Sequence, residues 1–177
     1  FPNGISAINL ENINSIQTSN NFENILDIVK TLPTWKDIEF IKRNTNLPVI
    51  LKGITSVDYA KKAVSLGIDA IIVSNHGGRT IDTLPASIDI LPKIANEIKG
   101  KIPILFDGGI KRGTDVIKAI SLGASAVMIG RPIMYGLATA GALGVAHTLK
   151  ILKEELEVSM IFTGCKTLKD INKNILF

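Results

Sequence analysis

An internal repeat constrains the fold of this chain more than any other feature. Residues 63–73, AVSLGIDAIIV, recur as residues 119–129, AISLGASAVMI. The apolar runs ahead of them also match, LPVILKG at 47–53 against IPILFDG at 102–108. The chain therefore holds two successive copies of a strand–helix–strand unit. Strands that alternate with helices predict the α/β class, with a parallel sheet and right-handed crossovers.

The repeat and its flanking residues predict where the elements begin and end. Ser56 is expected to cap the first helix of the repeat and Gly67 to end it, while Thr114 is expected to cap the helix that ends at Leu122. The expected strands are 47–53, 69–74, 102–106 and 125–129. The expected helices are 57–66, 86–99, 114–122, 137–156, a short one near 168–172 and another around 21–29.

The length of the chain decides between a whole barrel and part of one. Four β/α units make half of a TIM barrel, and a complete barrel takes about 250 residues, with about 200 near the minimum. The chain has 177 residues, and a half barrel alone would expose two strand edges. We therefore expect a fragment, or a chain that pairs with another half, and Phe1 in place of Met suggests an absent upstream portion. Residues 1–32, rich in Asn, Ser and Ile, are expected to form a loop or lid.

Composition narrows the classes of function. The net charge of +4 is modest and the basic residues form no run, so no nucleic-acid partner is expected. No apolar run approaches the ~18–20 residues that cross a bilayer, so no membrane partner is expected either. The single Cys165 excludes an internal disulfide and fits a reducing compartment. We expect no metal site.

Two side chains that can carry chemistry follow the second expected strand. His76 and Arg79 belong to the segment SNHGGR at 74–79, in which the glycines allow the backbone to approach a ligand. A histidine there can act as a general base near neutral pH. The planar guanidinium of Arg79 can bind a carboxylate through two hydrogen bonds. The alternatives are a structural histidine bonded to backbone and a surface ion pair between Arg79 and Asp82.

The other strands also end in cations and glycines. Lys52 ends the first strand, where an ammonium can stabilise negative charge that appears during a reaction, although a plain surface lysine is the alternative. The run DGGIKRG at 107–113 and the turn GRP at 130–132 offer backbone N–H groups, a helix N-terminus and a guanidinium to an anion. Loops after the last strands of a barrel often bind phosphate. Together these segments predict a phosphate-bearing cofactor, and neither the Walker nor the Rossmann pattern is present.

Taken together, the segments resemble the FMN-dependent 2-hydroxy acid oxidases and dehydrogenases, most of all the animal 2-hydroxyacid oxidases. The resemblance rests on LKG at 51–53, SNHGGR at 74–79, DGGIKRGTD at 107–115 and GRP at 130–132. It implies that residues 33–177 are the C-terminal half, about four β/α units, of an FMN-binding (β/α)8 barrel. It also implies FMN as cofactor, an (S)-2-hydroxy acid such as glycolate, lactate or a longer one as substrate, and O2 as the oxidant that becomes hydrogen peroxide.

The resemblance implies a role for each residue of the site. Lys52 would lie near the pyrimidine edge of the flavin and stabilise the reduced, anionic ring, and Ser74 would contact FMN. His76 would take a proton from the substrate, and Arg79 would bind the substrate carboxylate. The ribityl chain and phosphate would be held by Asp107, Gly108, Gly109, Ile110, Lys111, Gly130 and Arg131.

The sequence departs from the family pattern in three respects. Lys111 stands where the family usually has Arg, which keeps the charge but loses the guanidinium fork. Thr80-Ile81 replaces the usual Gln-Leu. The first half of the barrel is absent, and with it the tyrosines, the aspartate partner of the histidine and a second substrate arginine. Tyr59 and Tyr135 are not expected to replace those tyrosines.

Two alternatives to the oxidase remain open. One is a dehydrogenase of the same family that passes electrons to a quinone or cytochrome, which Gly78 favours because several oxidases carry Ala there. The other is an inactive half barrel, in which His76 and Arg79 would have no use. The resemblance further implies a homo-oligomer, commonly a tetramer, and a peroxisomal location, or otherwise a cytoplasmic one.

Overall fold

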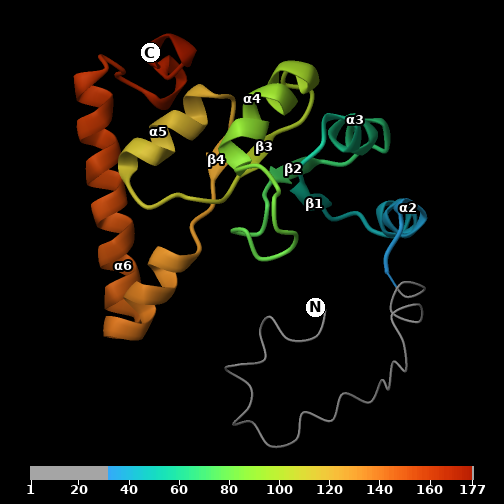
Figure 1. Ribbon diagram of the computed structural model, residues 1–177, viewed down its shortest axis with the longest axis horizontal. Coiled ribbons are helices and arrows are strands. Elements are labelled where there is room, and N and C mark those ends of the chain that lie inside the picture. Colours follow the sequence, from blue (N-terminus) through green and yellow to red (C-terminus); the bar gives the residue numbers. More distant parts are fainter. Residues whose placement is uncertain (1–31, 177) are drawn as a thin grey trace, which may run out of the picture. The chain divides into compact units, whose positions relative to one another are not determined.

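The computed structural model describes residues 32–176 (Figure 1). The chain divides into two units between Thr45 and Asn46. Helix α2, Trp35–Arg43, is the described helix of the first unit. The Asp37 carboxylate accepts hydrogen bonds from the Thr34 backbone N–H (2.6 Å) and hydroxyl (2.7 Å), which caps the start of α2. The sequence analysis did not predict α2. The expected lid, apart from Leu32, and the expected helix around 21–29 lie outside the described residues.

The second unit is built on a four-stranded parallel sheet in the order β1-β2-β3-β4. Its strands are β1 Ile50–Ile54, β2 Ala70–Val73, β3 Ile104–Phe106 and β4 Ala126–Val127. Each strand overlaps a predicted one, and neighbours in the sheet are consecutive in the chain. The fold is therefore a parallel α/β fold and part of a (β/α) barrel, as predicted.

Three helices alternate with the strands: α3 Val57–Ser65, α4 Ser87–Ile98 and α5 Gly113–Ser121 (Figure 1). The predicted cap of α3 is confirmed, because the Ser56 hydroxyl accepts a hydrogen bond from the Asp58 backbone N–H at 3.2 Å. The predicted stop at Gly67 and the predicted end of the later helix at Leu122 are confirmed as well. Gly67 and Gly123 follow α3 and α5 with φ of +69° and +108°, values that favour glycine after a helix.

The start of α5 differs from the prediction. The N-cap is Arg112, so Thr114 lies inside the helix rather than at its cap. The reason is the carboxylate of Asp115, which accepts hydrogen bonds at 3.0 Å from the backbone N–H groups of Lys111 and Arg112. A side chain from within the helix therefore fixes the backbone just ahead of α5, and the helix begins at Gly113, one residue before Thr114.

The last helix, α6, starts earlier than predicted and contains a break. It runs from Arg131 to Phe162 and follows β4 almost directly, with Pro132 in its first turn, where a missing N–H costs nothing. Its backbone leaves helical geometry at Ala140 and Gly141. The two segments meet backbone to backbone, because a Cβ on Gly144 would lie 1.9 Å from the Gly136 carbonyl oxygen.

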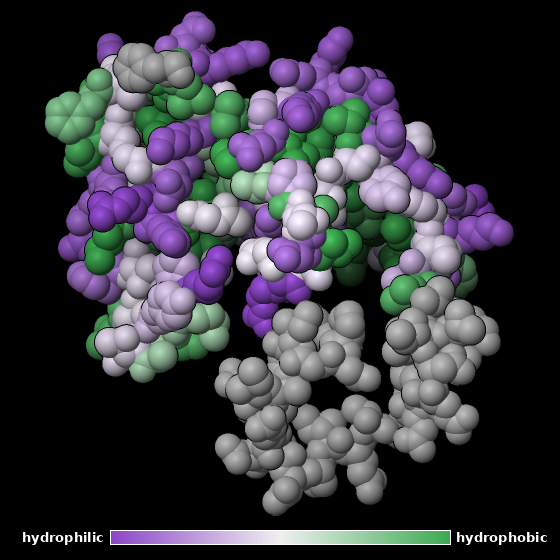
Figure 2. All heavy atoms as spheres, in the orientation of Figure 1, coloured by the Kyte–Doolittle hydropathy of each residue, from purple (hydrophilic) through white to green (hydrophobic). Residues whose placement is uncertain are grey.

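Small and apolar residues surround the break in α6. In Figure 2, pale and green atoms gather at this end of the helix, where Leu143 is 80% exposed and Leu137 48%. Beyond α6 lie two short 3-10 helices, Leu168–Asp170 and Lys173–Ile175, near the predicted short helix. None of the helices within residues 32–176 combines the length and the apolar character needed to span a membrane.

The core between sheet and helices holds the strand ends in place. All four residues of β2 are buried, and Ile71 and Val73 are fully so. Leu91 and Ile94 of α4 and Phe106 of β3 are also buried. Each such side chain contributes about 1.5–3 kcal/mol relative to exposure. The loops that leave β2 and β3 therefore start from rigid positions.

Candidate active site

A cleft of about 760 Å³ lies at the carboxyl ends of the four strands. Residues from β1, from the loops after β2 and β3, from the segment between β4 and α6, and from the start of α6 line it. Its volume falls within the range of about 300–1,000 Å³ that is typical of small-molecule sites. The lining residues are Lys52, His76, Gly77, Arg79, Asp107, Gly108, Gly109, Ile110, Lys111, Met128, Ile129, Gly130, Arg131, Pro132, Met134 and Tyr135.

The cleft brings together every predicted site residue except Ser74. Lys52, His76 and Arg79 line it beside the glycine turn 107–111 and the Gly130-Arg131 turn. Ser74 is only 2% exposed and instead contacts its neighbours in the site. The structure thus places these residues around one cleft, while their roles in a site remain predictions.

Lys52 is held at its place in the cleft by two partners, which directly follow strands β2 and β3. Its ammonium forms an ion pair with the Asp107 carboxylate and a hydrogen bond of 2.9 Å to the Ser74 hydroxyl. Lys52 and Asp107 occupy equivalent positions in the two copies of the repeat. Gly53, with φ of +94°, forms a bulge next to Lys52 in β1. Bulges of this kind redirect neighbouring side chains.

The loop that carries His76 has its backbone donors turned inward. Four successive N–H groups, 75 to 78, donate to acceptors within the loop and the start of α4. The acceptors are Ser87 Oγ (3.0 Å), Ser74 Oγ (3.1 Å), Asn75 Oδ1 (3.1 Å) and the Asn75 carbonyl (3.1 Å), in that order. His76 itself has φ of +57°, which is uncommon for a residue with a side chain. Because these N–H groups already have acceptors within the protein, the loop offers a ligand in the cleft its side chains rather than its backbone donors.

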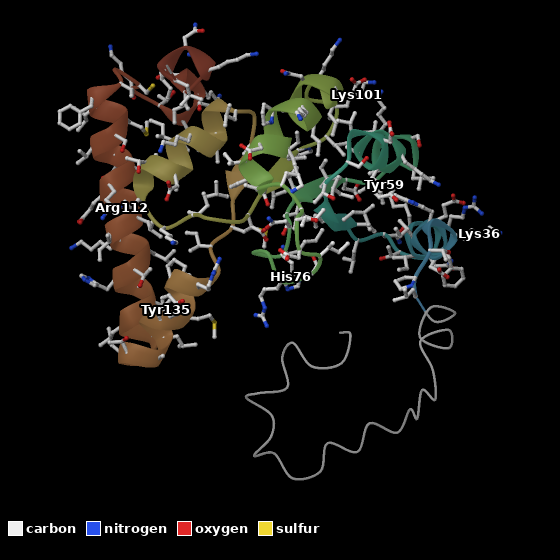
Figure 3. All side chains as sticks on the ribbon, in the orientation of Figure 1. Lys36, Tyr59, His76, Lys101, Arg112 and Tyr135 are labelled. Atoms are coloured by element: carbon white, nitrogen blue, oxygen red, sulfur yellow. The ribbon has the colours of Figure 1, made fainter. Side chains whose placement is uncertain are left out.

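His76 and Arg79 both reach the cleft from this loop. Figure 3 shows His76 projecting from the loop after β2, and both side chains belong to exposed residues that line the cleft. The alternative in which Arg79 pairs with Asp82 is not observed among residues 32–176. The Asp82 carboxylate instead accepts a hydrogen bond from the Thr83 N–H at 3.0 Å. His147, the second histidine, is exposed on α6 and does not line the cleft.

The opposite part of the cleft is suited to an anion. Gly108 and Gly109 have φ of +104° and +83°, a conformation that glycine adopts without strain. Among the described residues, the charged side chains on the lining are two lysines, two arginines and a single carboxylate, which is paired with Lys52. Arg131 lies across the histidine loop, because a Cβ on Gly77 would be 3.5 Å from its Nη2. This donor set fits the phosphate of FMN.

The N-terminus of α5 is not part of that anion site, contrary to the expectation from the sequence. The Glu155 carboxylate of α6 accepts a hydrogen bond from the Gly113 N–H at 2.8 Å and lies 3.7 Å from the Arg112 guanidinium. A carboxylate of the protein thus occupies the position that an anion would take. A bound phosphate is left with the glycine turn and the side chains of Lys111 and Arg131.

Several further side chains of the cleft were missed by sequence reasoning. Met128, Met134 and Tyr135 line it, and Tyr135 is 66% exposed at the start of α6 (Figure 3). Met128 was missed because it lies at the end of the predicted strand 125–129, whereas Met134 and Tyr135 were missed because the helix was predicted to start at Leu137, which placed these two residues in a connecting loop. The Pro132 signal for a helix start could have found them.

The chain belongs to the FMN-dependent dehydrogenase family, whose model matches residues 6–177. It is 52% identical over 141 residues to the peroxisomal (S)-2-hydroxyacid oxidase GLO3 of Arabidopsis thaliana, covering 80% of this chain and 39% of that protein. It is 50% identical over 143 residues to an L-lactate oxidase of Nostoc sp., covering 81% and 39%.

A solved structure of a mandelate oxidase variant with a monooxide FMN adduct is also similar. It matches with a TM-score of 0.76 and 45% identity, over 77% of this chain and 44% of that one. The chain thus spans about two fifths of the length of these relatives. The family and the FMN-binding barrel type predicted from the sequence are confirmed.

Proposed function

We propose that the protein is an FMN-dependent oxidase of (S)-2-hydroxy acids that produces a 2-keto acid and hydrogen peroxide. The observation that carries this proposal is the position of His76 and Arg79. Both come from one loop and line one cleft with the cationic glycine turns. A base and a carboxylate-binding group at the same rim are what the oxidation of a 2-hydroxy acid requires.

The residues of the cleft form two groups, which would contact different parts of FMN. Gly108 and Gly109, together with the side chains of Lys111 and Arg131, would hold the phosphate. Lys52 would be directed to the ring, since its ammonium is fixed between Asp107 and Ser74. FMN, when bound, supplies the acceptor for the two electrons that leave the substrate.

The substrate would be bound and activated by the histidine loop. Arg79 would bind the carboxylate of the 2-hydroxy acid and orient the carbon that carries the hydroxyl group. His76 would take one proton from the substrate as the C–O single bond becomes the carbonyl. The substrate loses two electrons and two protons in total, and O2 takes them up to give hydrogen peroxide. Lys52 would stabilise the negative charge that develops beside it.

The oxidase is favoured over the dehydrogenase by the names of the similar proteins, which include an (S)-2-hydroxyacid oxidase and an L-lactate oxidase. A peroxisomal location, by analogy with the Arabidopsis relative, and a tetrameric assembly belong to the same proposal. They rest on similarity to other proteins rather than on the geometry of the cleft.

The test is anaerobic mixing of the FMN-loaded protein with glycolate or (S)-lactate, followed by a pulse of O2. We expect loss of the flavin colour, rapid return of the colour after the pulse, and one hydrogen peroxide for each keto acid. His76→Ala should abolish the bleaching, and His147→Ala, on the exposed face of α6, is the matched control. Slow reoxidation would favour the dehydrogenase, and bleaching of His76→Ala at the normal rate would refute the assigned base.

A further inference from the structure

We propose that Ser87, in the first turn of α4, is a positioning residue that sets the orientation of His76. This inference rests on the proposed function, because it concerns the base of that reaction. Ser87 lies twelve residues after the loop it contacts and does not line the cleft. Its effect on the chemistry must therefore pass through the backbone of the histidine loop.

The contact is made by a buried hydroxyl. Ser87 is only 3% exposed, and its Oγ accepts a hydrogen bond of 3.0 Å from the Asn75 backbone N–H. The Asn75 side chain is fixed at both ends, since Nδ2 donates to the Pro85 carbonyl at 3.3 Å and Oδ1 accepts from the Gly77 N–H at 3.1 Å. The residue before His76 is thus held by its backbone and by its side chain.

The orientation of His76 depends on this anchoring. With φ of +57°, His76 adopts a backbone conformation that a residue with a side chain rarely takes unless its surroundings impose it. The peptide between Ser74 and Asn75 is fixed by the Ser87 hydroxyl, and the next peptide, between Asn75 and His76, is fixed by the Ser74 hydroxyl. Loss of the Ser87 acceptor would free the first of these and leave a backbone N–H without its partner.

The same hydroxyl packs against the glycine turn that we assign to FMN. A Cβ on Gly108 would lie 3.0 Å from Ser87 Oγ, 3.5 Å from Ser87 Cβ and 3.6 Å from Asn75 Oδ1. Ser87 therefore bonds to the loop that carries the base, and it occupies the space beside Gly108 in the turn that would carry the cofactor. A residue in this place can fix the distance between the two.

Ser121 shows what a buried serine does when it has only a local role. It is 6% exposed, and its hydroxyl donates to the Lys118 carbonyl at 2.8 Å within the same helix. Ser121→Ala removes a buried hydroxyl of the same size and is the matched control for Ser87→Ala. Ser87→Thr keeps the acceptor oxygen and is the conservative variant.

The experiment has two readouts. Hydrogen–deuterium exchange of the peptide 74–79 is measured on the full chain, and the rate of flavin reduction and the Kd for FMN are measured on the FMN-loaded protein. In Ser87→Ala we expect exchange of that peptide to be faster at least tenfold. Flavin reduction should slow by about 10- to 100-fold, as for a misplaced catalytic group, with a change in FMN Kd of less than about threefold. Ser87→Thr should restore both values, and Ser121→Ala should change neither.

Equal exchange and equal reduction in Ser87→Ala and the unchanged protein would overturn the proposal, as would a Thr variant as impaired as the Ala variant. If Ser87→Ala does not fold, Ser87→Cys takes its place, since it keeps the volume but accepts hydrogen bonds weakly. A protein that never reduces its flavin would instead refute the proposed function. In that case the exchange of peptide 74–79 still decides whether Ser87 anchors the loop.

Discussion

Replacing Gly113 with Ala tests the contact that joins α5 to α6. The added Cβ would lie 2.1 Å from the Leu156 backbone nitrogen and 2.3 Å from the Glu155 carbonyl carbon. Both are backbone atoms of α6, so no side-chain rotation can relieve the clash. The helices would have to separate, and the Gly113 N–H would lose its hydrogen bond to the Glu155 carboxylate.

The expected cost follows from these two effects. Overpacking typically costs about 1–3 kcal/mol, and loss of a hydrogen bond to a charged group about 1.5–3 kcal/mol. We therefore expect Gly113→Ala to lower the free energy of unfolding by about 3–5 kcal/mol. In a chain of this size, that corresponds to a decrease in Tm of roughly 10 °C.

The assay is urea denaturation followed by circular dichroism, with Gly100→Ala as the control. Gly100 has φ of +74° but nothing within 4 Å of an added Cβ, so the control measures backbone strain without a clash. It should cost only about 1–2 kcal/mol. A Gly113→Ala variant that is no less stable than Gly100→Ala would refute the reasoning, since the two helices would then not be in backbone contact.

Three further predictions concern charged groups. Lys52→Met should slow flavin reduction by about 10²–10³-fold in stopped-flow measurements, since it removes the fixed cation of the cleft; an unchanged rate would exclude Lys52 from the chemistry. Lys111→Arg should lower the Kd for FMN several-fold in a fluorescence titration, because it adds the guanidinium fork; weaker binding would place Lys111 away from the phosphate. Hydrogen bonds from the Thr167 backbone N–H and then from its hydroxyl lower the pKa of Asp170. The ionised carboxylate therefore stabilises the fold above the pKa of the unfolded chain, and this contribution is lost as pH falls below about 4. Asp170→Asn should show a smaller loss of stability on acidification, and an unchanged acid titration would contradict that account.

The sequence predicted most of the fold because its signals are local. Strands β2 and β3 are short apolar runs whose ends are marked by polar or glycine residues, and the cap Ser56 and the stop Gly67 act within their own helix. The internal repeat then predicted the elements of its second copy from those of its first copy. The four strands and the residues that follow them were therefore predicted close to where the structure has them.

What the sequence could not predict depends on contacts between distant residues. The N-terminus of α5 is occupied by Glu155, 42 residues later in the chain, so the anion site is smaller than the glycine-rich segment suggested. The anchoring of the histidine loop by Ser87 also has no local signal, because a serine at a helix start is ordinarily explained by the helix itself. The early start of α6 was predictable from Pro132, but the turn at 130–132 was interpreted as a loop only.

The most direct test of the central claim separates binding from oxidation. Arg79 is proposed to bind the carboxylate and His76 to remove the proton, so variants of these two residues should fail differently. Arg79→Ala should weaken the binding of a non-oxidisable 2-keto acid by about 100-fold or more. His76→Ala should bind the same compound with nearly the original Kd, yet reduce its flavin on addition of an (S)-2-hydroxy acid about 10²–10⁴-fold more slowly. If both variants lose binding to the same extent, or if either reduces its flavin at the original rate with unchanged affinity, the shared site of base and carboxylate clamp is contradicted.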